Sequence, residues 1–371
     1  MEEKQLNDLQ ELMCGMWEDS ETGFEEFKSC ERMCQVLEKY GFDVQRNVCD
    51  METAYIASMG SGKPVIAILA EYDALYGMSQ EADVAVETPL KHTDKGHGCG
   101  HHLLGVGAVS TGLNLIEYLK DHQGTIRVIG CPAEESGSGK AYLARDGAFD
   151  DVDIALTWHP GKFNQVSSGS AQSCIQAYYR FYGKSSHAAA APEIGRSALD
   201  ACELMNVGVN YLREHMAGYE RVHYAYTNVG GKSPNVVQAF AELKYLIRSN
   251  NNANVVKLYD RVANIAKGAA MMSGVECEVI FDEGLSNVIP NFTLENMLRG
   301  IFKNKKLPTY TKEELAYAQS FKDSFKDDPA LGIKDVENAA EVKKYVMENP
   351  LCDIYVQTKP NDTVGMGSTD V

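Results

Sequence analysis

The stretch Gly96-His97-Gly98-Cys99-Gly100-His101-His102 places one thiol and three imidazoles within seven residues. Cys99 and His101 are two residues apart, so both side chains can face one point on an extended turn. Thiolate and imidazole are ligands of zinc and similar divalent metals, and the glycines permit backbone angles that let ligands crowd around an ion. The stretch therefore predicts a metal site. A glycine-rich turn with incidental histidines is the alternative, because one Cys-x-His is a short motif.

Three apolar segments predicted as strands are each followed by residues that can bind metal or move protons. They are Val65–Ala70 before Glu71 and Asp73, Ile126–Cys131 before Glu134 and Glu135, and Asp153–Thr157 before His159. Sheets of the α/β class place their chemistry at the carboxyl ends of strands. Together with the Cys99 turn, we expect four strand ends to offer metal-ligand types at one edge of one sheet. Solvated carboxylates and a structural histidine are the alternatives for each position alone.

The totals exclude several classes of protein. With 371 residues the chain exceeds the usual size of one core, so two domains are expected. The net charge of −17 argues against nucleic acid and against an anionic membrane surface as partner. No run of 18 apolar residues is present, and the ten cysteines show no disulfide framework. The first residues lack a basic stretch and an apolar core, so we expect no signal peptide. The sequence therefore predicts a cytoplasmic protein whose partner is neither nucleic acid nor a membrane, and the net charge says little about a small substrate.

Hydrophobic patterning divides the chain into regions of two classes. Region 1–168 alternates buried strands with amphipathic helices, which predicts an α/β fold. Region 169–284 follows the order strand, helix, strand, strand, helix, strand of an α+β plait, so we expect an inserted domain. Region 285–371 is expected to return to the first domain, with three helices and a short strand at 352–356.

Seven motifs together resemble the M20 metallopeptidases and amidohydrolases over nearly the whole chain. Within this family the chain is most similar to the group that contains p-aminobenzoyl-glutamate hydrolase and the M20 domain-containing 2 dipeptidases. The motifs are AEYDAL at 70–75, GHGCGH at 96–101, PAEE at 132–135, ARDGAFDDVD at 144–153, WHP at 158–160, SHAA at 186–189 and GSTDV at 367–371.

The resemblance implies a zinc-peptidase-like mixed sheet between helices, with a centre for one or two divalent ions, zinc or manganese. The implied ligands are Cys99, His101, Glu135 and His159. Glu134 would be the general base, and Asp73 would orient a ligand histidine from behind. Hydrolysis of an amide requires an activated water, a Lewis acid on the carbonyl and a proton for the leaving amine, and this set supplies all three. Because Glu134 and Glu135 are adjacent on a loop, one can bind metal while the other acts as base.

The inserted region would be a ferredoxin-like lid that also forms a homodimer. The resemblance implies that His187 reaches the active site of a neighbouring subunit and steadies the oxyanion. Asn235 and Arg248 match lid positions that hold the carboxylate of the substrate, and a guanidinium fork fits a carboxylate. The expected reaction is hydrolysis of the amide bond of an N-acyl or aminoacyl amino acid, such as p-aminobenzoyl-glutamate or a dipeptide.

Three features depart from the pattern of the family. Glu71 stands where dinuclear relatives carry a histidine ligand, and His102 stands where relatives usually carry Asp or Asn, so both roles stay open. The family continues past the GSTDV motif to a final histidine ligand, whereas no histidine follows His223 here. We therefore expect region 285–371 to be a second part of the catalytic domain that is truncated at its C-terminus.

Two other interpretations remain at this point. A truncated, inactive or regulatory homologue would dimerise through the lid and bind metal weakly. A thiol amidohydrolase would use Cys99 as nucleophile and His101 as base, and it would leave Glu135 and His159 without a role. Metal content, and sensitivity to chelators or to alkylation, distinguish these interpretations.

Overall fold

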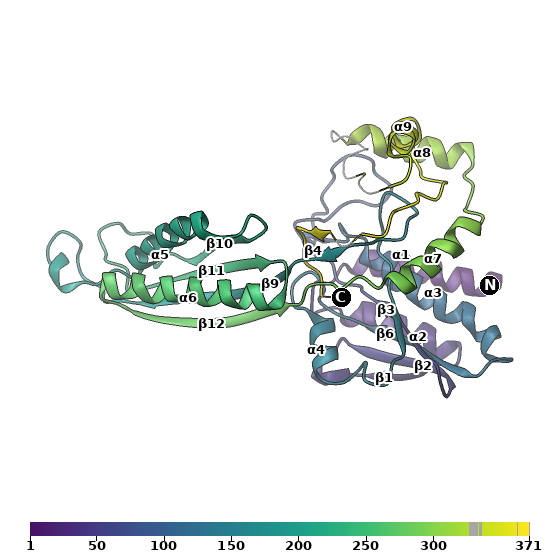
Figure 1. Cartoon of the computed structure of the whole chain (residues 1–371), viewed down its shortest axis with the longest axis horizontal. Coiled ribbons are helices and arrows are strands. Elements are labelled where there is room, and N and C mark those ends of the chain that lie inside the picture. Colours follow the sequence, from purple (N-terminus) through teal and green to yellow (C-terminus); the bar gives the residue numbers. More distant parts are fainter. Residues whose placement is uncertain (326–332, 334–335, 362, 371) are drawn as a thin grey trace. The chain divides into compact units, whose positions relative to one another are not determined.

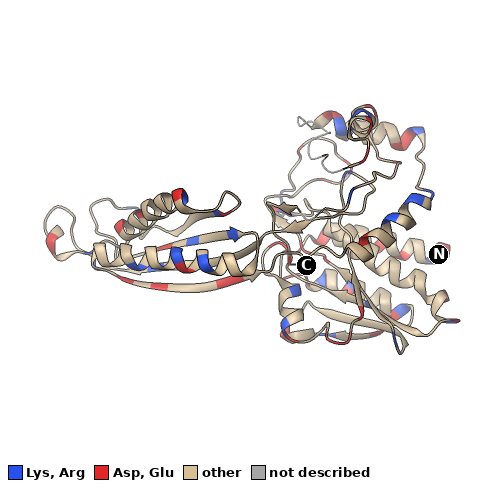
Figure 2. Cartoon of the chain, viewed as in Figure 1, with Lys and Arg blue, Asp and Glu red and all other residues tan. Residues whose placement is uncertain are grey.

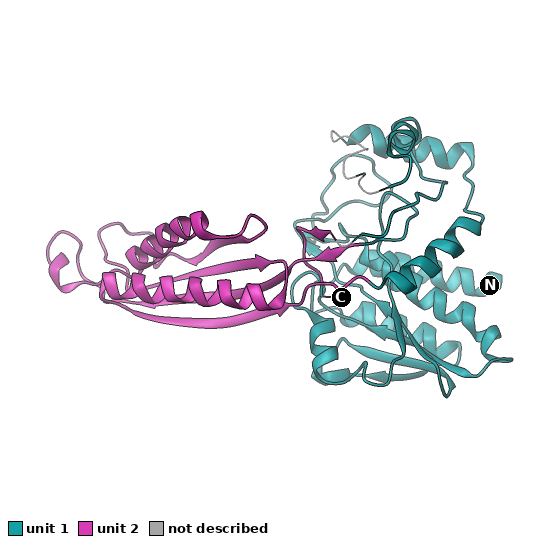
Figure 3. Cartoon of the chain, in the orientation of Figure 1, with its two compact units in different colours: residues 1–168, 291–361, 370–371 teal, residues 169–290, 362–369 magenta. Residues whose placement is uncertain are grey.

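The computed structural model describes residues 1–325, 333, 336–361 and 363–370. The chain forms two compact units (Figure 3). Unit 1 comprises residues 1–168, 291–361 and 370–371, and unit 2 comprises residues 169–290 and 362–369. Within the described residues, no helix combines the length and the apolar character needed to cross a lipid bilayer.

Unit 1 is built on a five-stranded mixed sheet with the order β1-β2-β6-β3-β7 (Figure 1). β3 is parallel to both β6 and β7, whereas β2 is antiparallel to β1 and β6. The three parallel strands therefore end at the same edge of the sheet. The strands are β1 (Asp43–Arg46), β2 (Tyr55–Ser61), β3 (Val65–Ala70), β6 (Gly124–Gly130) and β7 (Ile154–Leu156).

Helices cover both faces of this sheet, as the sequence predicts. Successive side chains of a strand point to opposite faces, so Ile68 and Ala70 of β3 pack with the first three helices while Ala67 and Leu69 pack on the side of α4. A strand buried on both faces needs a continuous apolar run, and Val65–Ala70 supplies one. The helices are α1 (Glu3–Asp19), α2 (Phe27–Lys39), α3 (His101–Leu119) and α4 (Gly139–Arg145), with the 3-10 helix η1 (Val48–Asp50) beside α4.

The later part of unit 1 is helical. It contains α7 (Phe292–Asn304), α8 (Lys312–Ser324) and α9 (Ala339–Glu348). The strand predicted at 352–356 is wrong, because Tyr355 forms only an isolated bridge with Asn164. The Asn164 side chain donates to the carbonyl of Cys352 (2.6 Å), and the Asn164 carbonyl accepts from the Val356 amide (2.9 Å). Among the described residues, the segment therefore bonds to Asn164 and to Tyr345 of α9 and not to a neighbouring strand.

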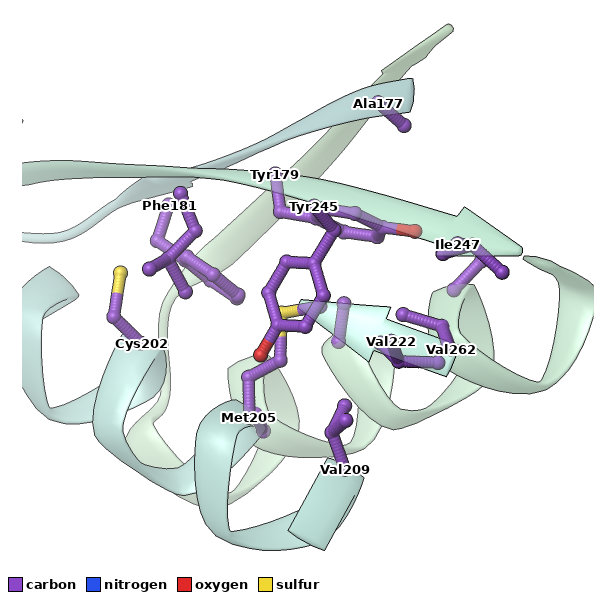
Figure 4. Close-up of a cluster of buried hydrophobic side chains, with 14 of the residues drawn as sticks. Ala177, Tyr179, Phe181, Cys202, Met205, Val209, Val222, Tyr245, Ile247 and Val262 are labelled. Carbon is purple, nitrogen blue, oxygen red and sulfur yellow. The ribbon is translucent and has the colours of Figure 1, made fainter. Parts of the chain in front are cut away.

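Unit 2 has the ferredoxin-like arrangement that the sequence predicts. Its sheet is antiparallel with the order β10-β11-β9-β12, and the chain runs strand, helix, strand, strand, helix, strand. Tyr179, Phe181 and Tyr245 point from one face of the sheet onto Met205 and Val262 of the two helices (Figure 4). The elements are β9 (Ser173–Tyr182), α5 (Ala198–Leu212), β10 (Arg221–Asn228), β11 (Phe240–Ser249), α6 (Asn252–Ser273) and β12 (Glu276–Leu285).

Short elements complete unit 2. β8 (Ser170–Ala171) pairs in parallel with β13 (Val364–Gly365), which comes from the distant segment 363–369. The 3-10 helices η2 (Pro192–Ile194) and η3 (Arg213–His215) flank α5. Unit 2 is therefore assembled from two separate stretches of the chain.

Candidate metal centre

The polar residues that follow the parallel strands of unit 1 gather at the carboxyl edge of the sheet. Asp73 follows β3, Glu134 and Glu135 follow β6, and His159 follows β7. Parallel neighbours end at the same edge, so their loops meet there. Three of the four expected strand ends thus belong to one sheet.

The turn with Cys99 and His101 reaches the same edge by another route. It follows the small separate ladder of β4 (Leu75–Tyr76) and β5 (Lys95–Gly96) and opens α3, so the expectation of a fourth strand end in the main sheet is wrong. Because α3 lies between the parallel strands β3 and β6 in the chain, it begins at the edge where β3 ends. Gly100 has φ 79°, and a Cβ there would lie 3.2 Å from Pro160, so glycine fits this turn.

Cys99, His101 and His159 form a first group of potential ligands. One ligand atom from each lies within 4.8 Å of the others, and Cys99 Sγ is 3.3 Å from His159 Nε2. Two ligands at tetrahedral angles around zinc, with ordinary Zn–S and Zn–N bonds, would be about 3.5 Å apart. A sulfur and two imidazole nitrogens at these separations fit a zinc-like ion.

Glu71, His101 and Glu134 form a second group within the same 4.8 Å limit. His101 Nε2 lies 3.4 Å from Glu71 Oε2 and 4.0 Å from Glu135 Oε1. These three atoms are buried, and none has a hydrogen-bond partner among the residues that the structure describes. Buried polar atoms without partners are costly. A cation placed among two carboxylate oxygens and an imidazole nitrogen would satisfy them together, so the residues fit a divalent ion.

Asp73 hydrogen-bonds both to the segment that carries His101 and to the segment that carries Glu135. Its Oδ1 is 2.7 Å from His101 Nδ1, and its Oδ2 accepts a hydrogen bond from the Glu135 amide at 2.8 Å. The bond at Nδ1 orients the ring so that Nε2 faces the centre. Burial opposes protonation of His101, but hydrogen bonds with Asp73 and Cys99 outweigh it and raise the pKa of His101 to about 11. A divalent ion at Nε2 would displace that proton.

The surroundings of Cys99 favour the thiolate form of its side chain. Hydrogen bonds with His101 and then with His159 lower the pKa of the Cys99 thiol, although its partial burial acts in the opposite direction. The same contact with Cys99 raises the pKa of His159 to about 9. Thiolate is the form of cysteine that binds metal or attacks as a nucleophile. The contact between Cys99 and His159 therefore fits both a metal ligand and a catalytic nucleophile.

Glu26 holds the turn that carries the two glutamates and was not found from the sequence. Its Oε1 accepts a hydrogen bond from the Ala133 amide at 2.7 Å, and Ala133 has a φ of 57° in the left-handed region. Burial, with a contribution from the charge of Asp73, raises the pKa of Glu26 to about 7. Nothing in the local sequence distinguishes Glu26 from the neighbouring surface glutamates.

Lys140 is the second residue near the centre that sequence reasoning missed. Its side chain is buried, and its ammonium contacts Glu71 Oε1 at 2.8 Å and Asp370. The Lys140 amide also donates to Asp370 Oδ2 at 2.9 Å. Burial favours the neutral amine, but the two carboxylates outweigh it and raise the pKa of Lys140. One sequence feature could have pointed to Lys140. It lies in the first turn of α4, where the helix dipole disfavours a cation.

His102 lies outside both ligand groups, which answers one question left open by the sequence. It is buried, with its ring centroid 4.6 Å from that of His97 and 5.2 Å from that of Trp17. Burial lowers the pKa of His102 to about 4. The residue packs in an aromatic cluster and does not share the ligand groups.

The predicted lid residues lie at opposite ends of unit 2. His187 forms a bridge with Val236, and the Ala188 amide donates to the carbonyl of Asn235 at 2.9 Å, so His187 and Asn235 are neighbours. Basic residues are coloured blue in Figure 2, and Arg248 is the penultimate residue of β11, eight residues beyond Phe240. At about 3.3 Å per residue, Arg248 is roughly 26 Å from Phe240 along the strand, and the loops that carry His187 and Asn235 start at the Phe240 end, where the Gly183 amide donates to the Ala239 carbonyl.

Each end of unit 2 has its own hydrogen bonds. Nδ1 of His187 accepts from the amides of Ala189 (3.2 Å) and Ala190 (3.1 Å), which places a proton on Nε2 when the ring is neutral. At the other end, Arg248 Nη1 donates to Ser368 Oγ at 2.5 Å. His187 and Asn235 therefore cannot contact the same small molecule as Arg248 of the same chain.

Comparison with known proteins gives consistent results. The profile of peptidase family M20/M25/M40 matches residues 67–350. One of the p-aminobenzoyl-glutamate hydrolase subunits of Escherichia coli (strain K12) is 49% identical over 306 residues, which are 82% of this chain and 64% of that protein. The Xaa-Arg dipeptidase of Mus musculus is 32% identical over 234 residues, which are 62% of this chain and 50% of that protein. The chain thus spans less than two thirds of the length of both relatives.

Solved structures share the fold. An aminobenzoyl-glutamate utilization protein from Klebsiella pneumoniae superposes with a TM-score of 0.65 and 19% identity, covering 86% of this chain and 89% of that one. The YXEP protein of Bacillus subtilis, described as a dinuclear metal-binding peptidase of family M20, gives a TM-score of 0.57 and 18% identity, covering 100% and 85%. At these identities the likeness concerns the fold alone.

Proposed function

Because the chain belongs to peptidase family M20/M25/M40, we propose that it is a metal-dependent amidohydrolase that cleaves the amide bond of N-acyl or aminoacyl amino acids. The observation that carries the proposal is the convergence of Cys99, His101 and His159 with buried, unpartnered carboxylate oxygens at one sheet edge. Such a donor set of sulfur, nitrogen and oxygen is typical of zinc and related divalent ions.

The metal would be held by residues from four segments of unit 1. We assign Cys99, His101, Glu135 and His159 as ligands, with Asp73 orienting His101 and the Glu135 backbone. A bound zinc or manganese ion, or a pair of ions, supplies a Lewis acid for the carbonyl and lowers the pKa of the attacking water. Glu71, which also faces His101, is a further candidate ligand.

Glu134 is the proposed general base. It is half-buried, lies in the group with Glu71 and His101, and follows the strained turn that Glu26 holds. From there it can take a proton from the attacking water and later deliver it to the leaving amine. Its neighbour Glu135 is tied to Asp73 through the backbone, so the two adjacent glutamates can take different roles.

The substrate class follows from the relatives and from Arg248. The names of two relatives describe hydrolysis of p-aminobenzoyl-glutamate and of Xaa-Arg dipeptides, both of which end in an amino-acid carboxylate. A guanidinium has five N–H donors in a planar fork, which suits a carboxylate. We infer that Arg248 binds the substrate carboxylate.

His187 and Asn235 are proposed to act in the centre of a second subunit. Arg248 lies at the end of unit 2 from which the chain passes to unit 1, since it pairs with Cys174 near the start of β9. His187 and Asn235 lie at the far end, so a homodimer formed through unit 2 would let them approach a partner's centre. There, Nε2–H of His187 would donate to the oxyanion and stabilise it.

Glu134→Gln tests the proposal. Gln cannot accept a proton, so kcat for p-aminobenzoyl-glutamate or an Xaa-Arg dipeptide should fall about 100- to 10,000-fold, while the affinity for Mn²⁺ or Zn²⁺ measured by calorimetry stays within a few-fold. Glu117→Gln, on the exposed side of α3, is the matched control and should leave both quantities unchanged.

Three outcomes would contradict the proposal. Full turnover in Glu134→Gln would remove Glu134 as the base. Activity that survives chelation but is lost on alkylation would favour Cys99 as a nucleophile with His101 as its base. A wild-type chain that binds metal weakly and hydrolyses none of these substrates would favour the inactive or regulatory homologue.

A further inference from the structure

Lys140 carries a fixed positive charge beside the candidate centre. Its side chain is only 3% exposed, and the ammonium is bound by two buried carboxylates, Glu71 and Asp370. A buried ammonium between two carboxylates remains charged, because either carboxylate left alone in this position would be uncompensated. The cation is therefore a permanent part of the site.

Glu71 connects this ammonium to the ligand groups. Its Oε1 contacts Lys140 Nζ at 2.8 Å, while its Oε2 faces His101 Nε2 at 3.4 Å and has no hydrogen-bond partner among the described residues. A single carboxylate charge is thus shared between the ammonium on one side and any ion bound beside His101 on the other. Positive charges on both sides of one carboxylate repel each other.

The two ligand groups are consequently unequal. The group of Cys99, His101 and His159 contains no carboxylate, and none of its members is an ion-pair partner of Lys140 in the described part of the chain. The group of Glu71, His101 and Glu134 contains a carboxylate that is already paired with a cation. An ion on the Glu71 side therefore gains less from Glu71 than an unpaired carboxylate would give.

We propose that the Lys140 ammonium acts as an internal cation that holds Glu71 and weakens divalent-metal binding on the Glu71 side, so that the Cys99 side fills first. This inference rests on the proposed metal centre. It makes Lys140 a positioning residue, which acts through Glu71 and not on the substrate. It also assigns Glu71 a role that differs from that of an ordinary ligand.

Metal-binding isotherms test this inference without an activity assay. The purified chain is titrated with Mn²⁺ or Zn²⁺ at pH 8, and the stoichiometry and the affinity of each step are measured. Lys140→Met removes the ammonium and leaves Glu71 and Asp370 facing each other without a cation. The weaker or missing second step should then become at least about tenfold tighter, which corresponds to about 1.4 kcal/mol, with the first step little changed.

Control variants separate charge from packing. Lys140→Arg keeps the positive charge and should leave the second step weak. Lys120→Met removes an exposed ammonium paired with Glu117 and should change nothing. Because Lys140→Met can disturb folding, circular dichroism is recorded for every variant. If that variant does not fold, the pair Lys140→Met/Asp370→Asn, which removes both charges next to Glu71, carries the same expectation.

Each result decides between alternatives. A folded Lys140→Met chain with an unchanged or weakened second step overturns the inference and leaves Lys140 as a structural ion-pair residue. A wild-type chain that binds no divalent ion overturns the proposed metal centre itself. Tightening in Lys140→Met but not in Lys140→Arg supports the internal cation.

Discussion

A polar cluster inside unit 2 and a polar cluster at the sheet edge of unit 1 differ in whether their groups find hydrogen-bond partners. In the core of unit 2, the Tyr245 hydroxyl donates to Asn206 Oδ1 (2.5 Å), the Asn206 amide donates to the Tyr226 hydroxyl (3.1 Å), and Tyr226 donates to Glu203 (2.5 Å). At the sheet edge of unit 1, buried atoms of Glu71, His101 and Glu135 face one another and lack such partners in the described structure. The side chains of the unit 2 network satisfy one another, whereas a cation would be needed to satisfy the atoms at the edge of unit 1.

The two clusters differ in whether the buried atoms without partners belong to neutral or to ionisable side chains. Unit 2 also has buried polar atoms without partners, but they belong to neutral side chains on separate segments, those of Gln172, Tyr179, Ser186 and Ser273. Unit 1 has scattered neutral atoms of the same kind, such as Ser29 Oγ and Thr53 Oγ1, but at its sheet edge Glu71 Oε2 and Glu135 Oε1 lie 3.4 and 4.0 Å from His101 Nε2. Scattered neutral atoms cost stability locally, whereas converging charged groups form a binding site. The contrast is between the interior of unit 2, where polar groups satisfy one another, and the sheet edge of unit 1, where ionisable groups converge.

The largest effect is expected in the core of unit 2. Phe181→Ala should lower the free energy of unfolding by about 3–5 kcal/mol, because it leaves a cavity beneath a fully buried ring. Urea unfolding measures the loss, and calorimetry at low urea should find metal affinity within about twofold of wild type. Phe281→Ala, whose ring is 57% exposed on β12, is the matched control and should change stability by less than about 0.5 kcal/mol. A folded Phe181→Ala chain that has lost metal binding would show that the two units are not independent.

The next effect concerns the far end of unit 2. His187→Ala should lower kcat/KM about 100-fold, as expected for the loss of one oxyanion donor. Mixing this variant with Glu134→Gln under conditions of subunit exchange should restore up to about a quarter of wild-type activity, because half of the dimers then contain one complete centre. Mixed dimers, verified by two affinity tags, that remain inactive would place His187 in its own chain or outside the reaction.

The smallest effect depends on pH and concerns Glu26. Its pKa of about 7 in the folded chain exceeds the ordinary value of 4.5, so the folded state binds the extra proton and the stability of the metal-free protein should fall as pH rises from about 4.5 to 7. Glu26→Gln removes this dependence and should be about 1–3 kcal/mol more stable than wild type at pH 8, with little difference at pH 4. Unfolding curves recorded in chelator across this range measure it. Equal pH profiles for both proteins would show that Glu26 does not titrate there.

Sequence patterns predicted the parts of the fold that depend on local periodicity. The strand Val65–Ala70 was predicted with its observed bounds, because a strand buried on both faces is uniformly apolar. The segment 352–356 looked equally strand-like, but its pairing depends on Asn164, almost 200 residues earlier in the chain. Pairing partners that are distant in sequence leave no local signal.

The candidate site shows the same limit. Cys99, His101 and His159 were singled out by residue type, and the structure brings them together. Glu26 and Lys140 were missed, because glutamate and lysine are normally exposed and only the tertiary fold buries these two. The wide separation of Arg248 from Asn235 likewise follows from the β9–β11 register, which the sequence alone does not give.

The pairing of β8 with β13 has a consequence for the modularity of the chain. Unit 2 is not a single insertion, because the segment 363–369 returns to it and supplies both β13 and the Ser368 partner of Arg248. Recombination between relatives at two breakpoints, around 168 and 290, would transfer β8 without its partner strand. Exchange of the whole unit requires four breakpoints, so this domain must be engineered as two pieces.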